Sequence, residues 1–304
     1  MKSGYRFLAR WLAPLLLLFG ASALAADTPV LRVAYAGSMG VVMDESFGPA
    51  FTKAHEARFE GVGQGSFALA RLLAGKQMQA DVFVAITPPP MKVVRDASLA
   101  ERAVPVASTR MVVIYGPKSR FAKDFEAAAK GQKKWYEVLR QSGLRLGRTD
   151  PAVDPQGANA LLTLQLAESY YHQSGLLKDV AGELQNPQQI FAEPSLMSRL
   201  EAGQIDAAVG YASAAFSHHL PTIDLPDEIN LAQPSMQDAW YAKANLTLAD
   251  GKVLKAQPLV FYAAVLTNAK QPQLGADFVR LLQSAEGQAM FRERGYDPPH
   301  GEAL

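Results

Sequence analysis

The sequence from residue 31 to residue 76 reads LRVAYAGSMGVVMDESFGPAFTKAHEARFEGVGQGSFALARLLAGK. Two short stretches in it, Leu31 to Gly37 and Ala57 to Gly65, have the length and composition of β-strands. The stretches that follow them, Val41 to Ala54 and Ser66 to Lys76, carry apolar residues at helical spacing. Strands that alternate with helices favour an α/β fold with mixed, mostly parallel sheets.

The same alternation continues along the rest of the chain. A third apolar strand is predicted at 80–87, and the prolines at 88–90 begin the next helix. A long strand at Val106 to Gly116 has the length to cross into a second lobe. The pattern beyond it predicts helices at 157–171 and 194–203, a strand at 205–213, a hairpin around Asp250-Gly251, a strand at 258–267 and a helix at 275–295.

The amino-terminal segment has the three parts of a secretory signal peptide. Its first ten residues contain three basic side chains and no acidic one, and the apolar run WLAPLLLLF follows at 11–19. Small residues then lead to an A-x-A site that ends at Ala25. The alternative is a membrane anchor, but spanning a bilayer takes about 20 apolar residues. We therefore predict a cleaved signal peptide over residues 1–25, a periplasmic location and no stable membrane insertion after cleavage.

Composition excludes several classes of function. The 304 residues are 49% hydrophobic and 19% charged, which is typical of a globular protein. Without the three basic residues of the signal peptide, 27 basic residues face 29 acidic ones, a balance that does not indicate nucleic-acid binding. The chain has no Cys, which excludes disulfides, thiolate metal sites, Cys nucleophiles and a lipid anchor on Cys.

Three polar turns stand at the predicted starts of helices: Gly37-Ser38, Gly63 to Ser66, and Asp154 to Gly157. The N-terminus of a helix offers unpaired backbone N–H groups and a partial positive charge, so it binds anions without a basic side chain. Any one of these turns is most simply an ordinary N-cap. Because the three turns are divided between two lobes, together they favour a shared anion-binding cleft.

Other motifs in the sequence give only weak indications of nucleotide binding, catalysis or metal binding. The stretch from Gly61 to Ser66 lacks the spacing of a dinucleotide-binding loop and is not a nucleophile elbow. The five His residues show no metal-ligand spacing. We therefore expect no cofactor and no metal other than one carried by a bound solute.

Several segments, in order, resemble the substrate-binding proteins of molybdate/tungstate ABC importers, especially the tungstate-type branch. The resemblance implies two α/β lobes with a ligand cleft between them, as in periplasmic binding proteins, and a membrane permease as partner. The expected lobes are 26–112 with 240–304, and 113–239. The matching segments are YAGSMG (35–40), GQGSFALARLLAGKQMQADVFVAI (63–86), GRTDPAVDPQGANALLTLQLAESYY (147–171), LEAGQIDAAVGYAS (200–213), LPDEINL (225–231) and LADGKVLKAQPLVFYAAVLTNAKQP (248–272).

The resemblance also implies the residues that bind the oxyanion. Ser38 and Ser66 are expected to bind by hydroxyl and backbone N–H, and Gln156 and Glu193 by backbone N–H. Tyr211 matches the Tyr that lines the second lobe's side of the site.

One departure from the family concerns carboxylates. In the tungstate-type branch, two carboxylates approach the metal centre and raise its coordination number from four to six. Asp154 matches the first, but Gly210 stands where the second is expected. This predicts four-coordination, or five if Asp154 reaches the metal, unless Asp154 is bidentate or another carboxylate contributes. Glu193 is the nearest candidate for that carboxylate.

The leading hypothesis is therefore a binding protein, not an enzyme, that captures molybdate or tungstate. A second hypothesis keeps the fold and changes the ligand to sulfate, phosphate or an organic anion. An organic acid would favour an Arg in the cleft, and Arg148 is the candidate. A third is a periplasmic hydrolase using Ser38 or Ser66, which needs a His within reach.

Overall fold

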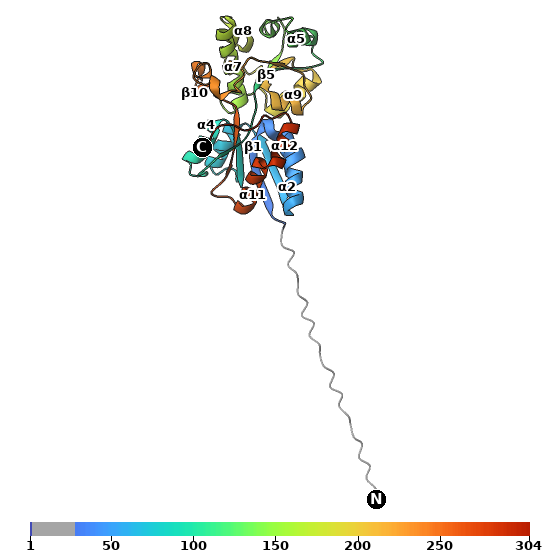
Figure 1. The fold of residues 1–304 in the computed structure, drawn as a ribbon, viewed down its shortest axis with the longest axis vertical. Helices are drawn as coiled ribbons and strands as arrows, with labels where there is room; N and C mark the ends of the chain where they lie inside the picture. The colour runs from blue at the N-terminus through green and yellow to red at the C-terminus, as the bar shows by residue number, and fades with distance from the viewer. Residues whose placement is uncertain (2–27) are drawn as a thin grey trace.

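The computed structural model describes Met1 and residues 28–304, which form two α/β lobes stacked end to end (Figure 1). The predicted signal peptide therefore lies outside the described residues, apart from Met1. No helix within the described part of the chain is long and apolar enough to span a membrane.

The first lobe is built on a five-stranded sheet in the order β2-β1-β3-β11-β4. The strand β1 pairs in parallel with β2 and β3, whereas β11 is antiparallel to both β3 and β4. The carboxyl ends of β1 and β2 consequently meet at one edge, which faces the second lobe. The strands are β1 (Val30–Ala36), β2 (Arg58–Gln64), β3 (Val82–Ile86), β4 (Val104–Ser108) and β11 (Val260–Val265).

Amphipathic helices cover this sheet. Phe47 and Phe51, four residues apart in the predicted helix at Val41 to Ala54, are both buried. They contact the ring of Phe278 at centroid distances of 6.3 and 5.4 Å. The predicted helix at 275–295 is broken at Ser284, whose side chain caps a second helix by accepting the Gly287 N–H. The helical segments are η1 (Gly37–Met39), α1 (Gly40–Val42), η2 (Met43–Phe47), α2 (Gly48–His55), α3 (Ser66–Ala74), α4 (Pro88–Asp96), α11 (Pro272–Gln283) and α12 (Ala285–Glu293).

The second lobe has a four-stranded sheet in the order β6-β7-β5-β8. Its strand β5 is antiparallel to β7 and β8, and only β6 and β7 are parallel. Both sheets are therefore mixed, with parallel pairing limited to β2-β1-β3 and β6-β7. The elements are β5 (Met111–Tyr115), β6 (Leu146–Gly147), β7 (Ala207–Tyr211), β8 (Thr222–Asp224), α5 (Ala122–Ala129), α6 (Trp135–Leu139), α7 (Pro155–Tyr171), α8 (Leu176–Ala181), α9 (Glu193–Ala202), α10 (Ala212–Ser217), η3 (Pro234–Met236) and η4 (Tyr241–Lys243).

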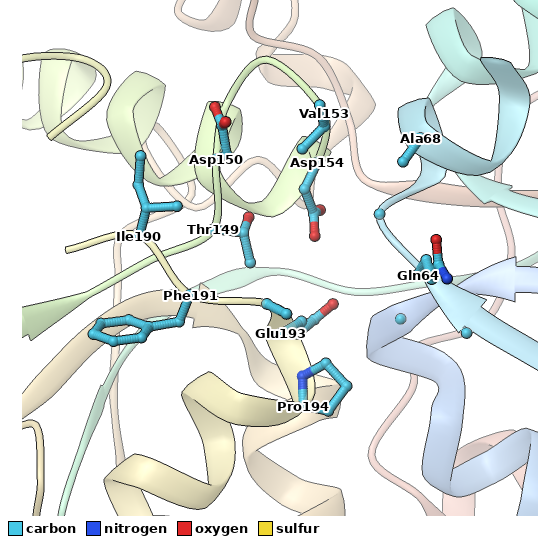
Figure 2. A pocket seen from close by; sticks show the side chains of 14 residues that line it. Gln64, Ala68, Thr149, Asp150, Val153, Asp154, Ile190, Phe191, Glu193 and Pro194 are labelled. Carbon is cyan, nitrogen blue, oxygen red and sulfur yellow. The ribbon is translucent and has the colours of Figure 1, made fainter. Parts of the chain in front are cut away.

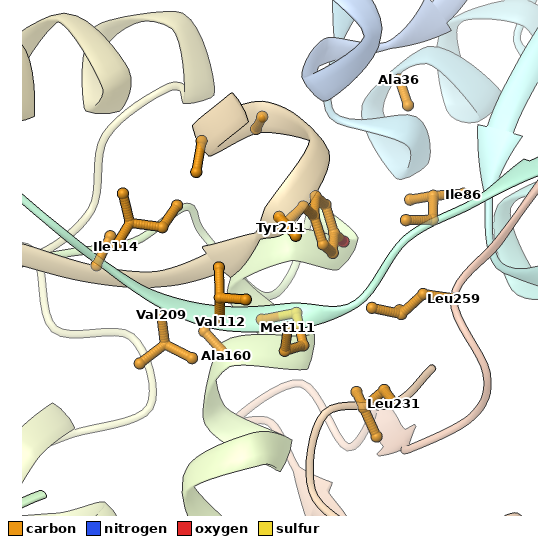
Figure 3. Packing of buried hydrophobic residues seen from close by; sticks show 14 of the residues in the cluster. Ala36, Ile86, Met111, Val112, Ile114, Ala160, Val209, Tyr211, Leu231 and Leu259 are labelled. Atoms are coloured by element: carbon orange, nitrogen blue, oxygen red, sulfur yellow. The ribbon is translucent and has the colours of Figure 1, made fainter. Parts of the chain in front are cut away.

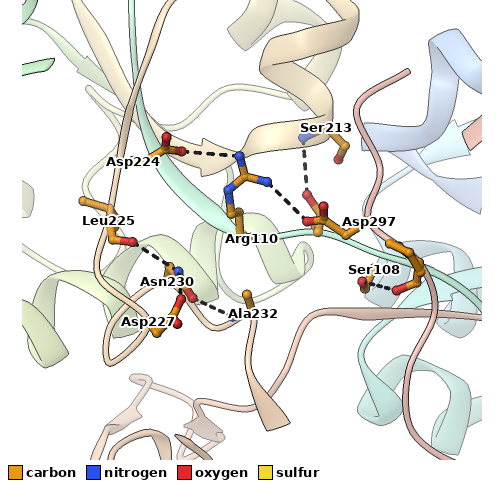
Figure 4. A network of polar contacts seen from close by, with 11 residues as sticks. Ser108, Arg110, Ser213, Asp224, Leu225, Asp227, Asn230, Ala232 and Asp297 are labelled. Atoms are coloured by element: carbon orange, nitrogen blue, oxygen red, sulfur yellow. Dashed lines mark hydrogen bonds and ion pairs between the residues drawn. The ribbon is translucent and has the colours of Figure 1, made fainter. Parts of the chain in front are cut away.

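The predicted long strand from Val106 to Gly116 is two strands, β4 and β5, in different sheets. The chain changes sheet at Thr109 and Arg110, so the expected lobe boundary at 112/113 falls inside β5. Arg110 forms ion pairs with Asp224 (3.4 Å) and Asp297 (3.3 Å) at this crossing (Figure 4). The strand breaks because its two halves have different hydrogen-bonding partners, β11 for β4 and β7 with β8 for β5.

The Asp250-Gly251 turn closes an antiparallel hairpin, as predicted, between β9 (Asn245–Thr247) and β10 (Val253–Lys255). Gly251 adopts a φ of 82°, which glycine tolerates without strain. Lys252 of this hairpin lies over the ring of Phe67, 3.4 Å from its centroid, and contacts the Ala152 carbonyl oxygen at 3.5 Å. The hairpin therefore contacts both lobes, although the sequence placed residues 240–304 in the first lobe alone.

The apolar core continues from one lobe to the other through the crossing. Ile86 of the first lobe and Val209 of the second belong to the same buried cluster, and Met111 and Leu259 join them at the crossing (Figure 3). Burying an aliphatic side chain of this size stabilises a fold by roughly 1.5–3 kcal/mol. The crossing is thus well packed, with a buried core that the two lobes share.

Candidate functional site

A cavity of about 390 Å³ lies between the lobes (Figure 2). Its walls come from the carboxyl ends of β1 and β2 and from segments at the starts of α3, α7 and α9. Because helix N-termini present free N–H groups, this arrangement suits an anion. The lining residues are Gly37, Gly63, Gln64, Gly65 and Ala68 of the first lobe, and Thr149, Asp150, Val153, Asp154, Ile190, Phe191, Ala192, Glu193 and Pro194 of the second.

Two carboxylates, Asp154 and Glu193, point into this cavity (Figure 2). Asp154 caps α7, its Oδ1 accepting the Gln156 N–H at 3.0 Å, and Glu193 is the first residue of α9. The two residues are only 8% and 5% exposed. Burial raises the pKa of Asp154 to about 6. Burial, followed by the charge of Asp154, raises the pKa of Glu193 well above its usual value.

Among residues 28–304, two buried oxygen atoms of this region have no hydrogen-bond partner: Glu193 Oε1 and Ser38 Oγ. Ser38 and Glu193 both line a second cavity of about 300 Å³, which shares Gly37, Glu193 and Pro194 with the first. Buried polar atoms in folded proteins nearly always have a partner. These two oxygens therefore indicate where a ligand would complete the hydrogen bonding.

Tyr211, the last residue of β7, brings a third polar group to the carboxylates. Its buried hydroxyl accepts a hydrogen bond from Asn159 Nδ2 at 3.1 Å. Burial raises its pKa, and the charges of Asp154 and Glu193 raise it further. The charges of both carboxylates therefore act on Tyr211, which is not among the residues that line either cavity.

The other two predicted ligand residues are engaged within the protein. The Ser66 hydroxyl, at the start of α3, accepts the Ile86 N–H at 3.4 Å. The Gln156 N–H, expected to bind the anion, donates to Asp154 Oδ1 instead. The Gln156 side chain accepts from Thr149 N (2.8 Å) and donates to Val209 O (2.7 Å). In this structure Gln156 orients the Asp154 turn and does not line the cavity.

Position 210 is not where a second carboxylate would enter the cavity. A Cβ atom on Gly210 would lie 3.0 Å from Ile114 Cδ1 and 3.3 Å from Gln156 Nε2, so a side chain there points into the second lobe. The carboxylate that joins Asp154 comes from Glu193, which the sequence assigned chiefly a backbone N–H. Glu193 is the carboxylate named as an exception to four-coordination, and the coordination number stays a prediction.

Two glycines allow the lobes to approach closely. A Cβ on Gly65 would lie 2.8 Å from the Val153 carbonyl oxygen, closer than real Cβ contacts allow. A Cβ on Gly37 would lie 3.2 Å from Glu193 Oε2. The Ala68 N–H also donates to Val153 O at 3.1 Å, across the cavity edge. The missing side chains thus let the turns of the first lobe reach the carboxylates of the second.

Neither alternative site assembles at the cavity. Arg148, the candidate for binding an organic acid, is 1% exposed, and its guanidinium donates to Gln189 Oε1 (3.2 Å) and Glu183 O (3.0 Å) inside the second lobe. His218 lines the second cavity with Ser38, but its Nδ1 pairs with Glu201 at 2.7 Å. Within residues 28–304, no hydrogen bond joins His218 to Ser38 and no group of three acidic or His side chains could hold a metal ion.

Sequence reasoning missed two supporting residues. The Thr149 hydroxyl accepts the Gly157 N–H at 2.7 Å and so anchors the turn that carries Asp154. Its place shortly before the polar turn at Asp154 to Gly157 is a local signal that could have identified it. Tyr296, near the carboxyl terminus, donates to the Ser38 carbonyl oxygen at 2.9 Å. No local pattern links residues so far apart in sequence.

Comparison with known proteins identifies the family. Residues 31–297 match the family described as "Bacterial extracellular solute-binding protein". The chain belongs to this family. It is accordingly a solute-binding protein and not an enzyme, as the sequence predicted.

Several relatives are similar over much of this solute-binding protein. An uncharacterized solute-binding protein of Petrotoga mobilis is 28% identical over 298 residues, which cover 93% of this chain and 89% of that one. The molybdate/tungstate-binding protein WtpA of Pyrococcus abyssi is 31% identical over 211 residues, with 63% and 60% covered. A Haloferax volcanii protein named "Putative ABC transporter molybdenum-binding protein" is 30% identical over 247 residues, with 80% and 74% covered.

Solved structures share the fold. The periplasmic molybdate-binding protein of Azotobacter vinelandii superimposes with a TM-score of 0.61 at 13% identity, covering 89% of this chain and 100% of that one. The sulfate-binding protein SubI of Mycobacterium tuberculosis gives 0.56 at 13% identity, with 89% and 87% covered. The solute-binding protein thus has the two-lobed periplasmic binding protein fold that the sequence predicted. A fold shared by proteins named for different anions does not identify the anion.

Proposed function

We propose that this solute-binding protein serves an ABC importer and captures a tetrahedral oxyanion, molybdate or tungstate, in the cavity between its lobes. The names of the Pyrococcus and Haloferax relatives support this ligand class, and the second name supports the ABC importer. A membrane permease is then the partner. The signal-peptide pattern of residues 1–25 supports export to the periplasm with cleavage near Ala25.

The pair of buried carboxylates is the observation that carries the proposal. A dianion such as sulfate would be repelled by Asp154 and Glu193, because its central atom accepts no further ligand. Molybdenum and tungsten accept added oxygen ligands, so the same carboxylates can bind the metal centre of their oxyanions. The unpartnered Oε1 of Glu193 is available for such a bond.

Neutral donors would hold the oxygen atoms of the anion. Ser38 contributes an unpartnered hydroxyl, Tyr211 a phenol, and Ser66 stands at the N-terminus of α3. Closure of the lobes would exclude water and strengthen each of these hydrogen bonds. Selection among anions would then depend on the geometry of these hydrogen-bond donors and on the two carboxylates.

The alternative of an organic anion is less well supported. Carboxylate ligands are commonly bound by a bidentate Arg. No Arg is among the residues that line the cavity, and Arg148 is committed elsewhere.

Calorimetric titration of refolded, ligand-stripped protein with molybdate, tungstate, sulfate and phosphate tests the proposal. We expect binding of the two metal oxyanions and much weaker binding of sulfate and phosphate. The Glu193→Gln substitution should weaken binding of molybdate and tungstate. It should thereby reduce the difference in affinity between these oxyanions and sulfate or phosphate. Glu201→Gln is the matched control, because Glu201 lies on the same helix, is exposed and pairs with His218.

X-ray absorption on the bound complex provides the second test. Six oxygen neighbours around the metal in the unmodified protein would support ligation by the carboxylates. The number of neighbours should then be lower in Glu193→Gln. Sulfate or phosphate binding as tight as molybdate binding, unaffected by Glu193→Gln, would refute the proposal.

A further inference from the structure

Tyr296 follows α12 in the first lobe and is held in a fixed orientation. Its ring packs between Phe261 of β11 and Phe291 of α12, at centroid distances of 5.5 and 5.3 Å. The residue is 3% exposed. A ring confined on two sides by aromatic neighbours leaves its hydroxyl little freedom of position.

That hydroxyl makes one well-defined contact, with the turn that carries Ser38. It donates to the Ser38 carbonyl oxygen at 2.9 Å, over a sequence separation of 258 residues. The Ser38 N–H partly offsets the rise in the pKa of the Glu193 carboxyl. Since the Ser38 carbonyl belongs to the planar peptide group that begins at the Ser38 Cα, holding it restricts the backbone that carries the Ser38 side chain.

The hydroxyl also lies at the junction between the lobes. Ser213 of the second lobe is fully buried, neighbours Tyr296, and has no hydrogen-bond partner for its own Oγ. Burial raises the pKa of Tyr296, and the charge of Glu193 raises it further, so the phenol keeps its proton. It therefore remains a hydrogen-bond donor at neutral pH.

We infer that Tyr296 is a positioning residue of the anion site, which orients the Ser38 hydroxyl toward the cavity by donating to the Ser38 carbonyl oxygen. The inference rests on the proposed function for the identity of the ligand. It adds a residue from the carboxyl-terminal segment to a site otherwise built from the ends of β1 and β2 and the starts of α3, α7 and α9.

Tyr296→Phe tests this, because it removes the hydroxyl and keeps the ring. Losing one buried hydrogen bond that orients a ligand group should weaken molybdate binding about 3- to 10-fold. Tyr241→Phe is the matched control. The buried Tyr241 hydroxyl donates to Asp227 O (2.7 Å) and accepts from Gln233 N (3.1 Å), outside either cavity at the site. The control should lower Tm and leave the affinity unchanged.

A double-mutant cycle separates positioning from general stability. If Tyr296 acts through Ser38, the loss caused by Tyr296→Phe should shrink at least twofold in a Ser38→Ala background. Equal losses in both backgrounds, or a lower Tm with unchanged affinity, would overturn the inference. Failure of the unmodified protein to bind any oxyanion would instead refute the proposed function, so the two outcomes are distinguishable.

Discussion

Replacing Asp154 by Asn should stabilise the ligand-free protein at neutral pH while it weakens oxyanion binding. The pKa of Asp154 is raised by burial to about 6 from an ordinary 3.8. A carboxyl whose pKa is raised by folding holds its proton more tightly in the native state than in the unfolded state. The contribution of Asp154 to the free energy of unfolding is therefore most favourable at low pH, falls as pH rises from about 3.8 to about 6, and is constant above that.

Linkage gives the magnitude. The ionised Asp154 costs the folded protein about 3 kcal/mol at pH 7.5 and about 1 kcal/mol at pH 4.5. Asn retains the cap on α7, because its side-chain oxygen also accepts the Gln156 N–H. Asp154→Asn should thus raise the free energy of unfolding by about 3 kcal/mol at pH 7.5, and by about a third of that at pH 4.5.

Urea denaturation of the ligand-free protein at the two pH values measures this effect. Asp250→Asn is the matched control, since the Asp250 carboxylate also accepts a backbone N–H two residues along the chain, at 3.0 Å, but is exposed. The control should change stability little at either pH. A destabilised Asp154→Asn at pH 7.5, or a gain that does not depend on pH, would refute the reasoning.

Three further substitutions test the site. Gly65→Ala should weaken oxyanion binding at least tenfold, because the new Cβ would collide with the opposite lobe. Gly40→Ala, whose Cβ would have open space around it, should bind normally. Equal affinities of the two variants in calorimetric titration would contradict this prediction. Gly210→Glu should lower Tm by crowding the second lobe without changing the preference among oxyanions in calorimetry. Arg148→Met should lower Tm and leave oxyanion affinity within about twofold, which calorimetry of the folded variant checks.

The local signals in the sequence predicted the elements that form the site. Gly37-Ser38 and Gly65-Ser66 follow strands directly, and the structure places both turns at the edge of the sheet that faces the second lobe. This could be predicted because strand, turn and helix start are adjacent in the chain. The break between β4 and β5 could not, because both halves are apolar and their separate partners come from distant segments.

The residue that supplies the second carboxylate was also hard to predict, because contacts between distant segments determine it. Motif position pointed to Gly210, two residues before the start of a short helix, and gave Glu193 mainly a backbone role. Which side chain enters the cavity depends on how α9 packs against the η1 turn, a contact between segments more than 150 residues apart. Tyr296 was the hardest residue to predict, because nothing in the sequence around it indicates a role in binding.

The direction of β1 also determines where the protein can be attached to a solid support without blocking its cavity. The strand starts at Val30, at the pole of the first lobe furthest from the second, and its carboxyl end reaches the cavity at Gly37 (Figure 1). A linker or solid support joined ahead of Val30 would hold the molecule by this pole and leave the mouth of the cavity unobstructed. Immobilised in this way, the chain could report oxyanion concentration through fluorophores placed on the two lobes, with its anchor outside the moving parts.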